Sequence, residues 1–381
     1  MRRNRESLIR QLRLLRTSRF WQMFGVGILL GASIVFIKLS LTEIAGSRSS
    51  VTNTNESTLG YHVSEGLGAN SKVDLKPMTE LESPDGSDMN ALDRLNVRVY
   101  LTKEKRMEIV PLETYVQGVL AGEMPVDFEL EALKAQAIAA RTYIVRRLAL
   151  KDRSGMEVEN ADVTDTIEHQ VYVPLAKLAS KWTGEDKKNN LAKLKKAVME
   201  TKGLIITYKG EPIQAAFFST SNGFTENSED YWEQSLPYLR SVASPWDEVI
   251  SPRYKETIEL NRQDFYRKMG LSGKLAEGKP AIKLLEKTAG NRIKTIAING
   301  QSFSGRDVRE RLALASSQFT WLIKNDSVAF TTFGFGHGIG MSQWGANGMA
   351  KEGSSAEDII RHYYTGTKVE QASKLPIQSN S

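Results

Sequence analysis

Residues 112–125 read Leu-Glu-Thr-Tyr-Val-Gln-Gly-Val-Leu-Ala-Gly-Glu-Met-Pro. The run predicts a helix, because apolar side chains recur in it at helical spacing, namely Tyr115, Val116, Val119 and Leu120. Pro125 ends the helix, since the residue before a proline is pushed out of the α region. Glu123 is therefore predicted at the helix C-terminus, where unpaired carbonyls disfavour an ionised carboxylate.

Glu123 is a candidate general acid. A carboxyl group at a helix C-terminus that is also partly desolvated keeps its proton to higher pH than an exposed one, and a general acid needs that proton. The alternative is a solvated glutamate at the end of a surface helix. From this run alone the solvated glutamate is the favoured interpretation, because one carboxylate is a weak signal.

A second helix is predicted a few residues later. Asp127 is a favourable N-cap, and two glutamates follow it in the first turn. Five alanines between residues 132 and 140 would let this helix approach its neighbours closely. Lys134 and Arg141 are seven residues apart and so share one face. They are either solvated or bind anionic or polar substrate groups near Glu123.

The residues downstream predict an α+β fold class. Alternating apolar residues on both sides of polar turns predict antiparallel hairpins over 97–110, 204–218, 282–298 and 319–333. Amphipathic or capped runs predict further helices; they cover 189–201, begin near Asn261, Ser304 and Met341, and end near Tyr364 after a cap at Ser354 or Ser355. Two loops, 219–227 and 334–340, follow predicted strands, and such loops often carry binding groups.

The N-terminal region predicts a membrane anchor. Residues 1–19 contain seven arginines and one glutamate. Their net charge of +6 equals that of the whole chain. The remainder is formally neutral, which argues against a nucleic-acid-binding body. Residues 20–41 are apolar and close to the ~20 residues that a spanning helix needs, and the positive-inside rule places the basic head in the cytoplasm. A cleaved signal peptide is the alternative, although its apolar run is usually ~7–15 residues.

The remaining boundaries follow from composition. Residues 42–93 are rich in Ser, Asn, Thr, Gly and Asp and are predicted to form a flexible linker. A single extracytoplasmic domain is predicted over 94–370, followed by a tail at 371–381. The chain has no cysteine and four scattered histidines, which excludes thiolate metal sites and gives little support to a metal-dependent hydrolase. We expect no cofactor and no metal.

Three blocks of sequence resemble the stage II sporulation protein D family, which includes amidase-enhancer proteins. The first, residues 113–143, contains Ala-Gly-Glu-Met-Pro at 121–125 and Ala-Arg-Thr-Tyr at 140–143. The second reads Phe-Phe-Ser-Thr-Ser-Asn-Gly-Phe-Thr-Glu-Asn at 217–227, and the third reads Phe-Gly-His-Gly-Ile-Gly-Met-Ser-Gln-Trp-Gly-Ala at 335–346. The resemblance spans roughly residues 94 to 367, and the order of the blocks makes chance agreement implausible.

The resemblance implies a peptidoglycan lytic transglycosylase, an α+β protein with antiparallel hairpins and helices around a substrate cleft that the three motifs line. Such an enzyme cuts glycan strands from which an amidase has removed the stem peptides, between N-acetylmuramic acid and N-acetylglucosamine. The muramic C6 hydroxyl attacks the anomeric carbon and leaves a 1,6-anhydro end. One acid/base residue serves this reaction, and Glu123 is the candidate, whereas a glycoside hydrolase usually needs two carboxylates.

Further site residues are also implied by the resemblance. Arg141, and less directly Lys134, would position Glu123 or bind the lactyl carboxylate of the substrate. Residues that match the family pattern and would face the cleft are Gln170 and Tyr172, and the candidates for sugar contacts are Ser219, Thr220, Asn222, His337, Ser342 and Gln343. His337 is alternatively a second catalytic group.

A non-catalytic binding module is the alternative function. It would bind peptidoglycan and stimulate an amidase, the property after which the amidase-enhancer relatives are named. Such a module would not need a carboxylate at a helix end. In either case the resemblance implies a sporulating bacterium and action at the septal or engulfing membrane. The implied partners are a sporulation amidase and a multi-span membrane protein.

Overall fold

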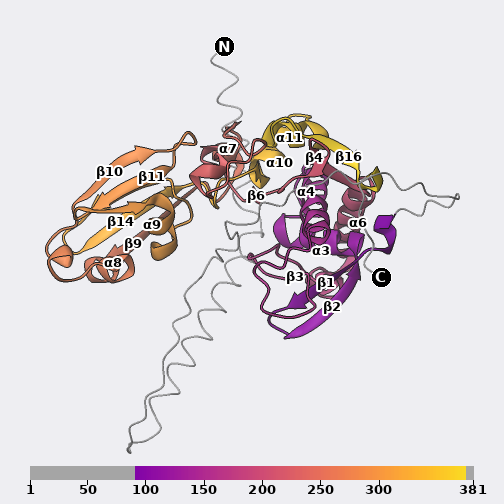
Figure 1. Ribbon diagram of the computed structural model, residues 1–381, viewed down its shortest axis with the longest axis horizontal. Helices are drawn as coiled ribbons and strands as arrows, with labels where there is room; N and C mark the ends of the chain where they lie inside the picture. The colour runs from indigo at the N-terminus through magenta and orange to yellow at the C-terminus, as the bar shows by residue number, and fades with distance from the viewer. Residues whose placement is uncertain (1–90, 375–381) are drawn as a thin grey trace, which may run out of the picture. The chain divides into compact units, whose positions relative to one another are not determined.

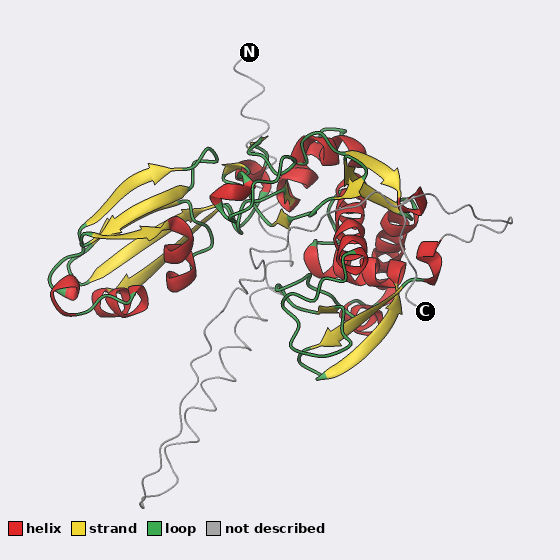
Figure 2. Cartoon of the chain, in the orientation of Figure 1, coloured by secondary structure: helices red, strands yellow, loops and turns green. Residues whose placement is uncertain are grey.

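The computed structural model describes residues 91–374, which form helices and several small sheets in a mixed α and β architecture (Figures 1 and 2). The predicted basic head, membrane-spanning helix and most of the linker and tail lie outside the described residues. Between residues 91 and 374, no helix is both long enough and apolar enough to cross a membrane.

The hairpin and helix predicted around Glu123 are confirmed. Strands β1 (Asn96–Leu101) and β2 (Arg106–Pro111) pair antiparallel, and β3 (Val163–Thr164) pairs parallel with β1. Helix α3 (Leu112–Glu123) follows β2 without a loop. Met124 has extended backbone angles, φ −121° and ψ 142°, as expected before a proline. Glu123 is thus the last residue of α3.

Helix α4 (Leu130–Ala149) is the central helix of the first hydrophobic core, and the five alanines between residues 132 and 140 are buried. It packs against α3 and α6 (Gly184–Met199), and α5 (Leu175–Lys181) lies beside both α3 and α6. The predicted N-cap at Asp127 is wrong. The helix starts after Glu129, whose backbone N–H donates to Asn347 Oδ1 at 2.8 Å, so a tertiary contact sets this helix start.

A second, separate hydrophobic cluster lies between residues 258 and 330. Two three-stranded sheets enclose it, β10 (Ile282–Lys287) with β11 (Ile293–Ile298) and β12 (Gln301–Ser304), and β13 (Phe319–Ile323) with β14 (Ser327–Phe333) and β9 (Lys255–Asn261). Helices α8 (Arg262–Met269) and α9 (Gly305–Leu312) have the predicted caps, since the Asn261 and Ser304 side chains accept hydrogen bonds from backbone N–H groups. Both predicted hairpins are confirmed.

Short strands between these two clusters bring distant segments together. Strand β6 (Phe217–Phe218) pairs parallel with β15 (Met341–Ser342), and β7 (Gly223–Phe224) pairs with β8 (Ala243–Ser244). The helix predicted from Met341 begins two residues later as α10 (Gln343–Lys351), because Met341 and Ser342 are taken up by β15. Residues 217–227 and 335–346 therefore lie side by side.

The remaining elements complete the two cores. Strand β4 (Leu204–Tyr208) pairs with β5 (Glu211–Pro212) and with β16 (Lys368–Gln371). The last α-helix among residues 91–374, α11 (Ala356–Tyr363), has the capping box predicted at Ser355. Short helical segments are α7 (Asp247–Ile250) and the 3₁₀ turns η2 (Ala91–Arg94), η3 (Ser228–Asp230), η4 (Gly273–Ala276) and η5 (Ala372–Lys374).

Candidate functional site

The Glu123 carboxyl group is half-buried at the C-terminus of α3. Its Oε1 accepts a hydrogen bond from the backbone N–H of Val171 at 2.7 Å. Burial raises the pKa of Glu123 above its ordinary value of 4.5, opposed by the Val171 N–H and by the nearby Gln343 amide, which both favour the ionised form. Desolvation wins over these two contacts, so the group keeps its proton to higher pH than a surface glutamate.

Two glycines of α3 allow residues 171–173 to pack closely on the helix, next to Glu123. A Cβ at Gly122 would lie 2.4 Å from the Val171 carbonyl oxygen, and one at Gly118 would lie 2.3 Å from the Tyr172 ring. The Val173 N–H also donates to the Gly118 carbonyl at 3.1 Å. Residues 171–173 therefore pack directly on the helix, and this close packing places the Val171 N–H against the carboxyl group.

Gly122→Ala is expected to displace residue 171 and to destabilise the fold by about 1–3 kcal/mol, the usual cost of overpacking. Because the displaced N–H no longer stabilises the ionised form, the pKa of Glu123 should rise further. Denaturant unfolding measures the first effect and NMR titration of the Glu123 carboxyl measures the second. Gln117→Ala, a half-buried position on the same helix, is the control. An unchanged pKa in a destabilised Gly122→Ala protein would show that the glycine serves packing alone.

Gln170 and Tyr172 lie against α3 and are buried. The Tyr115 hydroxyl donates to Gln170 Oε1 at 3.0 Å, and the Tyr115 and Tyr172 rings stack with centroids 5.5 Å apart. Burial raises the pKa of Tyr172 well above its ordinary value. The two side chains thus hold the 170–173 segment on the helix, instead of facing an open cleft as the resemblance implied.

The third motif reaches Glu123 through Gln343. The Ser342 side chain caps α10 by accepting from the Gly345 N–H at 3.3 Å, so Gln343 occupies the first position of that helix. The Gln343 side chain lies near the Glu123 carboxyl, and its buried Nε2 makes no hydrogen bond of ordinary geometry with residues 91–374. The amide therefore lies beside the protonatable carboxyl group without a regular hydrogen bond of its own.

A neighbouring contact fixes the start of α10 in place. The Trp344 N–H donates to the Ser219 carbonyl at 3.0 Å, and the Trp344 ring meets the Phe128 ring edge-on, with centroids 4.7 Å apart. Phe128 follows Glu123 by only five residues. The structure therefore brings segments of all three motifs to the end of α3.

Asp247 joins two of these motifs and is not singled out by any pattern in the sequence. Its buried carboxylate accepts from the Ser221 N–H at 2.8 Å and from the hydroxyls of Ser221, Ser244 and Ser342 at 2.9, 2.8 and 2.5 Å. Burial raises the pKa of Asp247 and these hydrogen bonds oppose the rise. The Ser342 hydroxyl is fully used within this network, so it holds the loop and α10 together and is not exposed for a sugar contact.

Arg141 is placed differently from the prediction. It is 0% exposed, and its Nε and Nη2 contact the two carboxylate oxygens of Glu113 at 2.9 and 2.6 Å. A further donor reaches the Leu204 carbonyl at 3.1 Å. The guanidinium therefore joins α3, α4 and β4 in the core, and its charge is paired with Glu113 instead of with Glu123 or a substrate.

Lys134 is also paired within the protein. Its Nζ lies 2.8 Å from Glu131 and 2.5 Å from Glu200, and its side chain is 17% exposed. Thus the two cations that share one face of α4 have different environments, and both have carboxylate partners.

Most of the second-motif side chains predicted to contact sugars form hydrogen bonds within the protein. The Thr220 hydroxyl lies 2.8 Å from the Ser251 hydroxyl and is buried, and the Asn222 amide donates to the Gly290 carbonyl at 2.8 Å and to the Gln318 side chain. Ser219 is half-buried. Among these three residues, Ser219 keeps the most accessible side chain.

His337 lies in an aromatic and cationic environment. Its ring is 5.7–6.2 Å from the rings of Phe218, Tyr231 and Trp232, and its Nδ1 accepts from the Ile339 N–H at 3.0 Å. Burial lowers the pKa of His337 to about 3, and the positive charges of three nearby arginines contribute to this shift. The imidazole is therefore neutral near pH 7, which argues against its acting there as a second proton donor.

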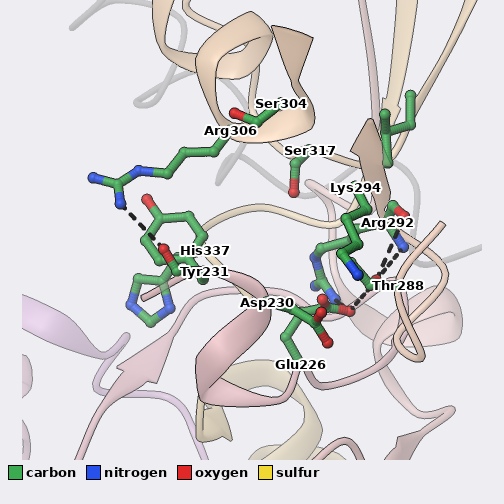
Figure 3. Close-up of a pocket in the computed structure, with 11 residues that line it drawn as sticks. Glu226, Asp230, Tyr231, Thr288, Arg292, Lys294, Ser304, Arg306, Ser317 and His337 are labelled. Carbon is green, nitrogen blue, oxygen red and sulfur yellow. Dashed lines mark hydrogen bonds and ion pairs between the residues drawn. The ribbon is translucent and has the colours of Figure 1, made fainter. Parts of the chain in front are cut away.

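His337 borders a cavity of about 30 Å³ (Figure 3). On one side Glu226, Thr288 and Arg292 are joined by hydrogen bonds, and on the other Arg306 approaches Tyr231. Across the part of the chain that the structure describes, no group of three or more His, Cys, Asp or Glu side chains is arranged to hold a metal ion.

Comparisons with known proteins find relatives along most of the chain. A family model described as stage II sporulation protein matches residues 100–208. Stage II sporulation protein D of Bacillus subtilis is 44% identical over 80% of this chain and 88% of its own length, and that of Bacillus amyloliquefaciens is 42% identical over 82% and 90%. A Bacillus subtilis protein named amidase enhancer is 29% identical over 66% of this chain and 40% of its own length.

Proposed function

Since this chain belongs to the stage II sporulation protein D family, we propose that it is a lytic transglycosylase of peptidoglycan. It would cleave peptide-denuded glycan strands between N-acetylmuramic acid and N-acetylglucosamine and leave 1,6-anhydro ends. One observation carries the proposal: a half-buried carboxyl group with a raised pKa, Glu123, lies beside the Gln343 amide.

Glu123 would act first as acid and then as base. Its carboxyl proton passes to the glycosidic oxygen as the bond to the muramic anomeric carbon breaks. The resulting carboxylate then takes the proton of the C6 hydroxyl, whose oxygen attacks the same carbon and closes the anhydro ring. Glu123 thus ends the cycle protonated. The reaction needs no second catalytic carboxylate and consumes no water. A positioned group of this kind contributes about 10²–10⁴ in rate.

The Gln343 amide would bind the substrate beside this reaction. Its Nε2 would donate to a sugar hydroxyl or carbonyl oxygen, and α10 would hold it in place because Ser342, Asp247 and Ser221 fix the start of that helix. A donor on a rigid element orients the reacting bond with little loss of entropy.

The rate is expected to fall as pH rises through the pKa of Glu123. The protonated form is the active acid, and because burial raises its pKa, the fall in kcat/KM should occur above pH 4.5, the ordinary value for glutamate. A pH profile of glycan cleavage measures this limb, with circular dichroism over the same pH range as the control for unfolding. A profile without a basic limb attributable to one group would contradict the assignment.

Mass spectrometry of the products tests the proposal itself. The protein is incubated with amidase-treated peptidoglycan, and the released sugars are identified by mass. Anhydro-ended sugars are the expected result. Reducing ends would identify a hydrolase and would redirect the search to a second carboxylate.

The cellular setting is part of the same proposal. Residues 20–41 would anchor the protein with its N-terminus in the cytoplasm, and residues 42–93 would tether a single outer domain, 94–370, whose cleft the three motifs line. The protein would remodel the septal wall during engulfment, together with a sporulation amidase and a multi-span membrane protein. The name of one Bacillus subtilis relative, stage II sporulation protein D, supports this setting.

A non-catalytic amidase enhancer is the second candidate function. The 29% identity to a protein named amidase enhancer favours it. Its signature would be the absence of any released sugar, with glycan binding intact and an amidase stimulated. The pKa and surroundings of Glu123 favour the enzyme, because a binding module does not need a half-buried carboxyl group at a helix end.

A further inference from the structure

The cavity beside His337 contains a buried cation with an unused edge. Arg292 is 2% exposed, and its Nη1 lies 3.2 Å from Glu226 Oε1 and 3.3 Å from the Phe224 carbonyl. Its Nε and Nη2 have no hydrogen-bond partner among residues 91–374. Leaving donors of a buried guanidinium unpaired is costly, so this edge is expected to have a ligand.

Gly338 lies against one flat face of the guanidinium. A Cβ at Gly338 would lie 2.4 Å from Cζ, 2.6 Å from Nη2 and 2.8 Å from Nε. Because Cζ is the nearest of the three, Gly338 covers the flat face of the group and not its edge. Nε and Nη2 are the two parallel donors with which arginine binds a carboxylate in bidentate fashion, and Arg292 lines the cavity.

The surroundings favour an anion. Arg292, Lys294 and Arg306 line the cavity together with Glu226 and Asp230. Lys294 and Arg306 are paired with Glu286 and Glu310, so an anion would be attracted by the unpaired donors of Arg292. Glu226 is already engaged, since it accepts from Arg292 Nη1 and from the Thr288 hydroxyl at 2.9 Å. The arginines near His337 also lower its pKa, as expected in a positive potential. A volume of about 30 Å³ admits one small polar group.

We infer that this cavity is a carboxylate subsite, in which the Nε and Nη2 edge of Arg292 binds the free lactyl carboxylate of a muramic acid residue. The inference rests on the proposed function for the identity of the ligand. In a glycan with stem peptides this carboxylate is an amide and carries no charge, so the subsite would distinguish denuded strands from substituted ones. The specificity that the sequence suggested for Arg141 would thus belong to Arg292.

Binding of the monosaccharide N-acetylmuramic acid to the full-length protein tests this inference. The sugar has no glycosidic bond to cleave, so binding is independent of catalysis. Isothermal titration calorimetry compares it with its lactyl methyl ester and with acetate. We expect the free acid to bind about ten- to a hundredfold more tightly than the ester, since a charged hydrogen-bonded pair is lost in the ester. Acetate alone should bind only weakly, because the sugar contributes the remaining contacts.

Two variants connect the preference to Arg292. Arg292→Gln alone leaves Glu226 buried without its counter-ion, so the double variant Glu226→Gln/Arg292→Gln removes both charges together. In the double variant the preference for the free acid should disappear while cooperative unfolding is retained. Lys283→Gln, which removes an exposed positive charge from β10, is the control and should keep the preference.

Each outcome separates this inference from the proposed function. Equal binding of acid and ester, or a preference that survives the double variant, would overturn the subsite. A preference that depends on Arg292 in a protein that releases no anhydro sugar would keep the subsite and overturn the enzyme. Anhydro products without any preference for the free acid would do the reverse.

Discussion

Glu123→Gln is expected to reduce the rate of glycan cleavage by about 10²–10⁴, the contribution of a positioned acid/base group. The glutamine has the same shape, and its amide oxygen can still accept from the Val171 N–H, so the fold should keep its stability. Glu123→Ala should lose the same activity and also the hydrogen bond. Release of anhydro sugars from denuded peptidoglycan is the measurement, with unfolding by denaturant recorded in parallel.

Asp127→Asn is the matched control for this experiment. Asp127 is exposed and lies four residues after Glu123, between α3 and α4, and its amide should leave the rate unchanged. If Glu123→Gln cleaved glycan at the wild-type rate, the acid/base role would have to belong to another group. If it lost activity only together with stability, the residue would be structural.

Arg141→Ala is expected to destabilise the fold by about 3–5 kcal/mol, the cost of breaking a buried ion pair and leaving one charge unpaired. The loss concerns two hydrogen bonds to Glu113 and one to the Leu204 carbonyl. Urea unfolding gives the free energy. The double variant Glu113→Leu/Arg141→Leu should recover most of the loss, because replacing both charges by apolar groups is often neutral.

An exposed pair of the same chemistry provides the comparison. Arg361 and Glu357 are four residues apart on α11, and their side chains are 60% and 48% exposed. Arg361→Ala should cost only about 0.3–0.5 kcal/mol. If Arg141→Ala were as mild as this, or if it unfolded normally but failed to cleave glycan, Arg141 would belong to the substrate site and the structural role would be wrong.

The sequence predicts the parts of the fold that neighbouring residues determine. Pro125 ends α3 wherever the rest of the chain lies, and Ser304 and Ser355 cap helices through residues three positions away. The hairpins around β1, β10 and β13 also follow from local alternation and turn residues. Glu123 could be placed at a helix end for the same reason.

Contacts between distant segments account for the predictions that fail. Asp127 does not cap α4, because Asn347 binds the Glu129 N–H and sets the helix start. The spacing of Lys134 and Arg141 correctly puts both on one face of a helix, but it cannot show that Glu113, 28 residues upstream, pairs with the arginine. Asp247 is missed because its three serine partners come from three separate segments, and no local pattern brings them together.

The parallel pairing of β6 with β15 has a consequence for the order in which the protein acquires its site. The Glu129–Asn347 contact spans 218 residues and the Ser221–Ser342 contact spans 121, and contacts of such long sequence separation form slowly because a large loop must close first. Since synthesis proceeds from the N-terminus, α3 emerges from the ribosome long before α10. The Glu123 carboxyl group therefore gains its neighbouring amide, Gln343, only after α10 has left the ribosome.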